Sequence, residues 1–410
     1  EVFYGGVFKS ATEPYRRTDM SEPNRKQMHQ FLQPAYNNFL SDIGESRNKP
    51  IAELKKMANE LSLGQAKTAL ANGMVDELGY IDNVIADLKE RIGLKEKDKL
   101  KTVSLNDYAG SFKKKKNFKV KDKIALVYAE GVIYQDKGDH GNIVDNDYIK
   151  ILRKIRKDDK IKAIVLRVNS PGGSAIASEN IWRELTLAKE AGKPVVVSMG
   201  DYAASGGYYI SCLADKIYAE PNTLTGSIGV FSMIPNMREL YNDKLGITFD
   251  TVKTAKYSNG LNVVYDMDDY EKSVYQNSTN ALYETFLKRV GDGRDMARDD
   301  VHKIAQGRVW IGSKAKEIGL VDEIGNIDDA IAAASELAGL EKYRIAEYPK
   351  QPDPMQEFIK ELTGEKDDKG IKTRILQEEL GEHYDIYRQV KEVVNMKGVQ
   401  ARLPFVLRFD

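Results

Sequence analysis

Two glycine-rich stretches, each directly after a run that predicts a buried strand, constrain the fold of this chain more than any other feature. Asn169-Ser-Pro-Gly-Gly-Ser174 follows the run 163–168, and Asp201-Tyr-Ala-Ala-Ser-Gly-Gly207 follows the run 194–198. A helical pattern comes after each stretch. Strands that alternate with helices predict an α/β fold with parallel strands covered on both faces.

The two turns also suggest chemistry. Paired glycines at neighbouring strand-to-helix turns allow backbone N–H groups to converge on one point, as an oxyanion hole requires. Ser205, on the second turn, would expose its hydroxyl beside that point. Either motif alone is usually an ordinary turn. Together, in the strand–turn–helix context that such motifs need, they predict an acyl-transfer site.

A serine hydroxyl needs a base before it attacks a carbonyl carbon. The chain has four histidines, and none lies in a strand-end or glycine motif: His29, His140, His302 and His383. We therefore favour a serine–lysine pair, in which the lysine must be desolvated so that its amine is neutral. Lys9 is the candidate because its segment, Glu1–Ser10, is aromatic and apolar, although a buried lysine can also be purely structural.

Several segments resemble the long, two-repeat form of peptidase family S49, the membrane-associated serine proteases of the signal peptide peptidase A type. The matching segments span nearly the whole chain: Gly6–Tyr15 with Asp19-Met20, Asn169–Ser174, Met199–Tyr209 and Leu224–Gly229. The resemblance implies the superhelical β-β-α spiral shared by Clp proteases and crotonases. Periodicity alone supports only an α/β fold.

The resemblance also implies roles for single residues. It makes Ser205 the nucleophile and Lys9 the general base, and it assigns Gly173, next to Gly172, to the oxyanion hole. Ser227 matches the serine that orients the lysine amine, although a strand-end serine bonded to backbone is the plainer interpretation. The implied substrates are cleaved signal peptides and other apolar, extended peptides, and the implied assembly is a homotetramer.

The chain repeats itself at a spacing of about 247 residues. Gly73–Gly79 matches Gly319–Gly325, and Asp19-Met20 matches Asp266-Met267. We expect residues 1–106 to be the second half of a first repeat, 107–122 a basic linker, 123–343 a complete protease repeat and 344–410 a helical and extended tail. Because the first copy is incomplete and the chain opens at Glu1, we expect a fragment of a longer protein.

The repeat also supplies a second candidate base. Lys256 occupies the position that corresponds to Lys9, and short, single-repeat members of the family take their lysine from there. The flanks of Lys9 match the family pattern and those of Lys256 do not, so we favour Lys9. The sequence leaves open whether Lys9 meets Ser205 within one chain or across two.

Composition excludes several alternatives. The 62 basic residues balance the 62 acidic ones, so no net charge favours nucleic acid. Cys212 is the single cysteine, which rules out an internal disulfide. No apolar run reaches membrane-spanning length. The family resemblance places the catalytic domains on the periplasmic side of a bacterial inner membrane, anchored through a segment missing from this chain. No cofactor or metal is expected.

Two other functions remain open on the sequence alone. A crotonase-type enzyme acting on acyl-CoA would share the fold and the glycine-rich turns, but it would need acidic groups at those turns. A catalytically inert scaffold fragment is the other alternative. The presence of both Ser205 and Lys9 favours a peptidase over either.

Overall fold

The computed structural model describes residues 1–111, 120–138, 141–350, 379–381, 384, 387 and 398–403. The chain divides into two compact units, one formed by residues 1–31 with 120–410 and the other by residues 32–119. The first 31 residues therefore belong to the same body as the predicted protease repeat. The expected domain boundaries at residues 106, 122 and 343 stay predictions.

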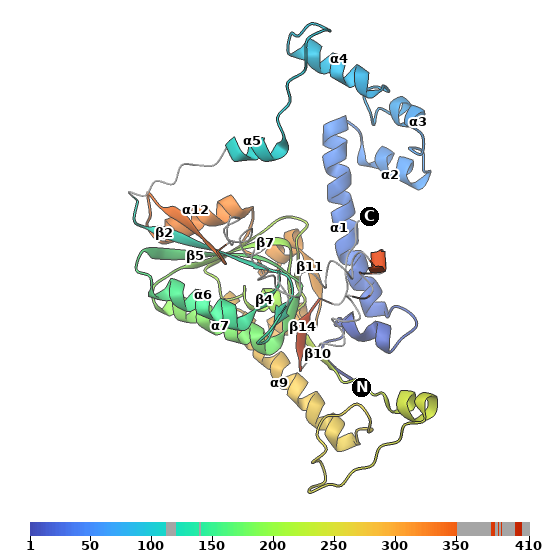
Figure 1. Cartoon of the computed structure of the whole chain (residues 1–410), viewed down its shortest axis with the longest axis vertical. Helices are drawn as coiled ribbons and strands as arrows, with labels where there is room; N and C mark the ends of the chain where they lie inside the picture. Colours follow the sequence, from blue (N-terminus) through green and yellow to red (C-terminus); the bar gives the residue numbers. More distant parts are fainter. Residues whose placement is uncertain are drawn as a thin grey trace. The chain divides into compact units, whose positions relative to one another are not determined.

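The larger unit contains a mainly parallel sheet (Figure 1). Within the described residues its strands lie in the order β11 (Val309–Ile311), β9 (Leu224–Gly226), β7 (Val195–Ala204), β5 (Ile161–Ser170), β2 (Lys123–Glu130) and β13 (Arg344–Tyr348), with β8 (Lys216–Ala219) and β12 (Glu323–Ile324) attached beside β7. Only the pair β11–β9 is antiparallel. β5 and β7 have apolar central runs, Ala163–Leu166 and Val195–Val197, that are buried because both faces of the sheet are covered.

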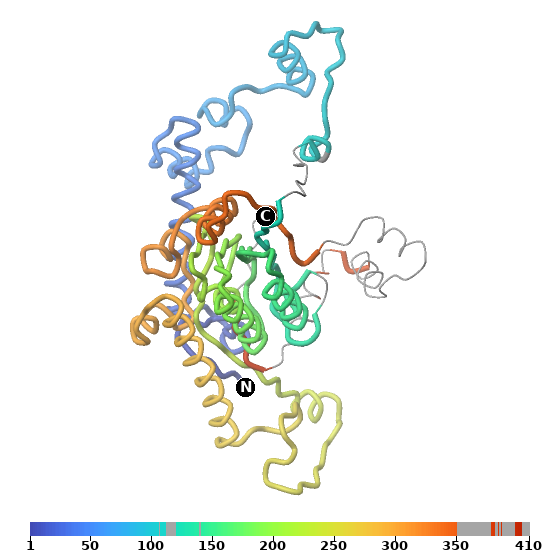
Figure 2. The backbone as a smooth tube through the Cα atoms, turned by 90° about the vertical axis from the view of Figure 1, so that its left-hand side faces the viewer, coloured from blue at the N-terminus to red at the C-terminus, as the bar shows by residue number. Residues whose placement is uncertain are grey.

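Helices cover the two faces of this sheet. α6 (Asp145–Lys157) and α7 (Ala175–Glu190) pack against each other on one face, and α12 (Ile327–Leu337) lies on the other (Figures 1 and 2). Alternate residues of the strands feed the two cores, as the two-residue period of a strand requires. Ile164 packs towards α7, whereas its neighbour Val165 packs towards α12.

A second sheet lies at the carboxyl ends of β5 and β7. Its strands follow the order β1 (Val2–Gly5), β10 (Val230–Met233), β14 (Gln400–Arg402), β6 (Gly172–Ser174), β3 (Ile133–Tyr134) and β4 (Ile143–Val144). β1 comes from the start of the chain and pairs antiparallel with β10. β14 comes from the end of the chain and fills the place between β10 and β6. Segments from both ends of the chain therefore join this sheet, and β14 is the one that pairs with the strand carrying Gly172 and Gly173.

The remaining helices complete the two units. In the larger unit they are the short 3₁₀ helix η1 (Ser10–Tyr15), α8 (Gly206–Tyr209), the short π-helix η2 (Leu240–Lys244), α9 (Asp269–Arg294), α10 (Arg298–Ile304) and α11 (Gly312–Glu317). α1 (Glu22–Arg47) begins there. Its later part belongs to the smaller unit, with α2 (Ile51–Asn59), α3 (Ala66–Ala71), α4 (Ile81–Arg91) and α5 (Leu105–Ser111).

The elements predicted for the protease repeat are present, and the α/β prediction is confirmed. The predicted strand 195–198 is longer than expected, because β7 continues to Ala204 and delivers the second glycine turn directly. Of the predicted extended segment 401–409, residues 401–402 form strand with Gln400. The predicted tail helices around 355–362 and 371–394 lie almost entirely outside the described residues.

Candidate active site

Ser205 stands at the turn between β7 and α8. Its backbone has φ 56° and ψ −114°, a conformation that a residue other than glycine adopts only under strain of about 1–3 kcal/mol. The Ser205 N–H donates to the Gly226 carbonyl over 2.8 Å, which fixes the turn to β9. The side chain is fully buried. This strained strand-to-helix turn presents the hydroxyl at the end of the sheet, as a nucleophile elbow does.

Lys9, in the segment between β1 and η1, places its amine beside this hydroxyl. The Nζ atom lies 2.9 Å from Ser205 Oγ, 3.0 Å from Ser227 Oγ and 3.2 Å from the Ser227 carbonyl oxygen. The side chain is only 1% exposed. Within the described part of the chain, no carboxylate lies within ion-pair distance of this amine. Burial without a counter-charge lowers the pKa of Lys9 well below its ordinary value of 10.5.

The three contacts of Nζ match the valence of a neutral amine. Such an amine has two N–H donors and one lone pair. Ser227 offers two acceptors, its hydroxyl and its carbonyl oxygen, and the Ser205 hydroxyl can then donate to the lone pair. The Ser227 hydroxyl in turn donates a hydrogen bond to the Gly307 carbonyl over 3.3 Å. Each polar group therefore has a partner when Lys9 is uncharged.

Two neighbours fix the backbone of Lys9. The Phe8 N–H donates to the Gln306 carbonyl over 2.9 Å, and Gly307 lies so close that a Cβ there would fall 2.7 Å from Lys9 Cβ. Gln27, fully buried on α1, donates through Nε2 to the Phe8 carbonyl at 3.4 Å and to Ser10 Oγ at 3.3 Å. Its Oε1 accepts the Val309 N–H at 3.0 Å. The amide thereby ties both flanks of Lys9 to β11.

The predicted oxyanion glycines lie across from the nucleophile turn. A Cβ on Gly172 would fall 2.6 Å from the Gly206 nitrogen, so the two glycine turns touch. The Gly172 N–H itself donates to Ser170 Oγ over 3.2 Å. Because the N–H groups of Gly172 and Ser205 are both occupied, those of the next residues along each turn, Gly173 and Gly206, are the candidates for an oxyanion hole.

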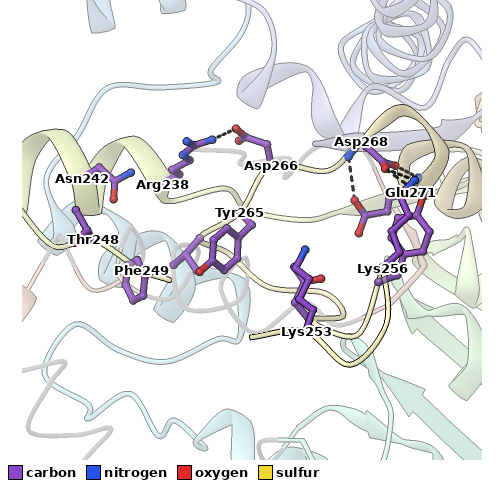
Figure 3. Close-up of a pocket in the computed structure, with 13 residues that line it drawn as sticks. Arg238, Asn242, Thr248, Phe249, Lys253, Lys256, Tyr265, Asp266, Asp268 and Glu271 are labelled. Atoms are coloured by element: carbon purple, nitrogen blue, oxygen red, sulfur yellow. Dashed lines mark hydrogen bonds and ion pairs between the residues drawn. The ribbon is translucent and has the colours of Figure 1, made fainter. Parts of the chain in front are cut away.

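Lys256 lies apart from this site. Its side chain is 72% exposed and its Nζ is 3.4 Å from Asp268 Oδ2, with the Tyr257 ring beneath the ammonium. Hydrogen bonding to Tyr257 and the nearby Asp268 raise the pKa of Lys256, which keeps the amine protonated. With Arg238 and Tyr265 it lines a polar pocket of about 470 Å³ that includes neither Ser205 nor Lys9 (Figure 3).

The histidines do not supply a base in the described structure. His29 is exposed, and His302 Nδ1 pairs with the Tyr283 hydroxyl at 3.0 Å. His140 and His383 lie outside the described residues. The Tyr283 hydroxyl also accepts the Gln306 N–H at 3.1 Å and so supports the loop behind Lys9.

Sequence reasoning missed the residues that hold Lys9 in place. Gln27 lies in a segment with a helical pattern, where a glutamine is usually exposed. Nothing in the sequence indicates that its amide is buried. The loop Gln306-Gly307 could have been suspected, since glycine commonly marks a turn. Both of its residues have positive φ, 56° and 82°.

A buried lysine amine bonded to a serine hydroxyl at a strained turn of an α/β sheet is the arrangement that an acyl-transfer site of the serine–lysine type would need. The sequence profile described as peptidase family S49 matches residues 1–95 and 187–341, and the chain belongs to that family. Membership confirms the expected fold class, the Clp protease/crotonase-like α/β spiral.

Three curated relatives are similar over most of this chain. Protease 4 of Haemophilus influenzae is 36% identical over 348 residues, which cover 82% of this chain and 56% of that protein. Protease 4 of Salmonella typhi is 37% identical over 371 residues, 88% and 59% of the two chains. The chloroplastic serine protease SPPA of Arabidopsis thaliana is 31% identical over 411 residues, 98% and 58%. The chain thus spans a little over half the length of these relatives.

Proposed function

We propose that this chain is a serine endopeptidase in which Ser205 is the nucleophile and Lys9 the general base. The observation that carries the proposal is the 2.9 Å contact between Lys9 Nζ and Ser205 Oγ in a site with no charged partner for the amine among the described residues. Burial lowers the pKa of the Lys9 amine and so favours its neutral form, which is the form that can accept the serine proton. The names of the relatives support the peptidase reaction.

The reaction would proceed through an acyl-enzyme. Ser205 Oγ attacks the peptide carbonyl carbon while its proton passes to Lys9 Nζ. The N–H groups of Gly173 and Gly206 hold the oxyanion. Lys9 then gives its proton to the leaving amine. Next it takes a proton from the water that attacks the acyl carbon, and it returns this proton to Ser205 Oγ as the ester bond breaks and the carboxylate leaves. Ser227 keeps the amine in line with Ser205 throughout without adding charge.

The remaining parts of the proposal come from the family resemblance. The substrates would be cleaved signal peptides and other apolar, extended peptides, and the active form would be a homotetramer. The protein would act at the periplasmic side of a bacterial inner membrane. No helix among the described residues combines the length and apolarity that a membrane span requires.

Covalent labelling tests the assignment. A fluorophosphonate probe should attach to Ser205 in the wild-type chain and in Lys256→Ala, and labelling should be lost in Lys9→Ala and Ser205→Ala. Labelling that survives Lys9→Ala but is lost in Lys256→Ala would overturn the choice of base. A burst of product from a peptide ester, with none from an acyl-CoA thioester, would indicate a peptidase. The opposite result would indicate an enzyme of the crotonase type.

A further inference from the structure

The loop Gln306–Arg308 offers three consecutive carbonyl groups to the residues around Lys9. The Gln306 carbonyl accepts the N–H of Phe8, the residue before Lys9, over 2.9 Å. The carbonyls of the next two residues accept the hydroxyl and the N–H of Ser227, over 3.3 Å and 2.8 Å. Ser227 in turn contacts the Lys9 amine. One short loop therefore sets the position of the base and of the serine that orients it.

This loop has a backbone conformation that needs support from its surroundings. Gln306 and Gly307 both have positive φ, 56° and 82°, and the left-handed region is unfavourable for a residue that carries a Cβ. The Gly307 N–H donates to the Ile228 carbonyl over 2.7 Å. The Gln306 N–H donates instead to a side chain, the hydroxyl of Tyr283 on α9, over 3.1 Å. The support of Gln306 therefore depends on one hydroxyl group.

The Tyr283 hydroxyl can accept this hydrogen bond only while its own proton is directed elsewhere. A phenol hydroxyl has one proton to donate, and its lone pairs accept. His302 Nδ1 lies 3.0 Å from the Tyr283 oxygen and can take that proton as an acceptor. Burial raises the pKa of Tyr283 to about 12, so the hydroxyl keeps its proton. With a neutral imidazole, Tyr283 donates to His302 and accepts from Gln306.

Protonation of His302 removes this acceptor. An imidazolium carries a proton on both ring nitrogens and can only donate. The Tyr283 oxygen then faces two donors, and its own proton has no other acceptor within hydrogen-bond distance among the residues that the structure describes. Water has little access, since the side chain is only 6% exposed. The hydrogen bond that supports Gln306 is therefore weaker when His302 is charged.

The charged groups beside His302 keep their charges over about pH 5 to 8, the range in which a histidine side chain ordinarily titrates. Glu284, next to Tyr283 on α9, accepts a hydrogen bond from Arg298 Nε of α10 over 3.0 Å. Hydrogen bonding to Arg298, and to a smaller extent the charge of His302, lowers the pKa of Glu284. Hydrogen bonding to Glu284 and then to Asp299 raises the pKa of Arg298. A change of charge in this cluster is therefore expected at the imidazole.

We propose that Tyr283 and His302 are positioning residues of the serine–lysine pair, and that peptidase activity falls when His302 is protonated. The inference rests on the proposed function. While His302 is neutral, Tyr283 supports the loop, and the loop keeps the Lys9 amine in line with Ser205. When His302 is charged, the loop relaxes and the two reacting atoms lose their alignment.

His302→Asn tests the dependence on pH. Asparagine offers Oδ1 as an acceptor in place of Nδ1 but cannot be protonated. The rate of fluorophosphonate labelling at Ser205 is measured for both chains between about pH 5 and pH 9, and the titration of Lys9 cancels in the ratio of the two rates. We expect the ratio of variant to wild type to rise about tenfold from the alkaline to the acidic end, the effect of one weakened hydrogen bond. A constant ratio overturns the inference.

His29→Asn is the matched control, because His29 is exposed on α1. Its ratio to wild type should stay constant over the same pH range. An equal rise in His29→Asn would show that the effect does not come from His302, and it would overturn the inference as well.

Tyr283→Phe tests whether His302 acts through the hydroxyl. The change keeps the ring in the core and removes the acceptor of the Gln306 N–H. We expect kcat for a peptide substrate to fall about tenfold with KM nearly unchanged, because the hydroxyl acts through the position of Lys9. Tyr270→Phe, on the exposed first turn of the same helix, should change neither quantity. Unchanged kcat in a folded Tyr283→Phe chain overturns the positioning role.

The double variant separates the two routes by which His302 could act. In the Tyr283→Phe background, adding His302→Asn should no longer produce a ratio that varies with pH, since the two changes remove the same hydrogen bond. A pH-dependent ratio that persists there would mean that the charge of His302 acts on Lys9 directly, which overturns the route through Tyr283. If Tyr283→Phe does not fold, the pH dependence of His302→Asn still decides. If Ser205 of the wild-type chain is not labelled at any pH, the proposed function itself fails.

Discussion

The amine of Lys9 lies 2.9 Å from the hydroxyl of Ser205, although 196 positions separate the two residues in the chain. Ser205 is presented by the turn after β7, in the predicted protease repeat, whereas Lys9 follows β1, at the start of the chain. β1 reaches the site because it pairs with β10. The meeting takes place within one chain, so no partner chain is required to complete this pair.

Replacing Lys9 with methionine should remove the base and little else. Methionine keeps an unbranched apolar side chain in the buried space but cannot accept a proton. We expect kcat/KM for a peptide substrate to fall about 10²–10⁴-fold, the usual effect of a general base. Lys256→Met is the matched control, because that amine is exposed and stays protonated. Equal loss of activity in both variants would contradict the assignment.

The rate of peptide cleavage should rise with pH. Lys9 accepts a proton only when neutral, and burial lowers its pKa well below 10.5. The fraction of active enzyme therefore increases as the pH passes upward through this lowered pKa, and kcat/KM should level off well before pH 10.5. A profile that keeps rising up to the ordinary lysine pKa would show that the amine is not desolvated in solution.

The buried Lys9 should also lower the free energy of unfolding of the chain. A lowered pKa in the folded state means that the unfolded chain binds a proton that the folded chain does not, in the window between the lowered value and about 10.4. The free energy of unfolding of the wild-type chain should therefore rise with pH through this window. Lys9→Met should lack that slope and should be more stable near pH 8 by about 0.5–2 kcal/mol.

Denaturant unfolding of both chains at several pH values measures the difference. Lys256→Met serves again as the control, since the raised pKa of Lys256 gives no increase in stability with pH below about 10.4. Parallel pH dependence of wild type and Lys9→Met would contradict the burial of an uncharged amine.

Gly307→Ala should show whether activity depends on the position of Lys9 rather than on backbone strain alone. Gly307 has φ 82°, and a Cβ there would fall 2.7 Å from Lys9 Cβ, so the lysine must move. Gly192 has nearly the same φ, 79°, with open space around the added Cβ. Both alanine variants should lose about 1–2 kcal/mol of stability from the left-handed backbone. Only Gly307→Ala should lose peptidase activity and fluorophosphonate labelling.

Much of the site could be predicted because its signals are local. Ser205 was identified from a strand followed by a glycine turn, and Lys9 from its apolar flanks and the family motif. The place of β14 in its sheet does not follow from the sequence, because the pairing of Gln400–Arg402 with Gly172–Ser174 joins segments more than 200 positions apart. Such register depends on tertiary packing, and the extended segment at 401–409 indicated only that it would pack on something.

The hydrogen bonds of Gln27 also join residues that are far apart in the chain. Its fully buried amide joins the Phe8 carbonyl and the Ser10 hydroxyl, on either side of Lys9, to the Val309 N–H of β11. Gln27→Leu leaves the backbone groups of Phe8 and Val309 without this partner, at a cost of about 1–3 kcal/mol for each group. Because Phe8 and Ser10 flank Lys9, the amine should lose its alignment with Ser205.

We therefore expect Gln27→Leu to lower both the melting temperature and kcat, with KM nearly unchanged because Gln27 contacts the segments that position Lys9 and neither glycine turn. Gln33→Leu, on the exposed surface of the same helix, should leave all three quantities as they are. Gln27→Asn, which keeps the amide but shortens its reach, should recover part of the stability without recovering kcat. A rise in KM with constant kcat would mean instead that Gln27 supports peptide binding rather than the position of Lys9.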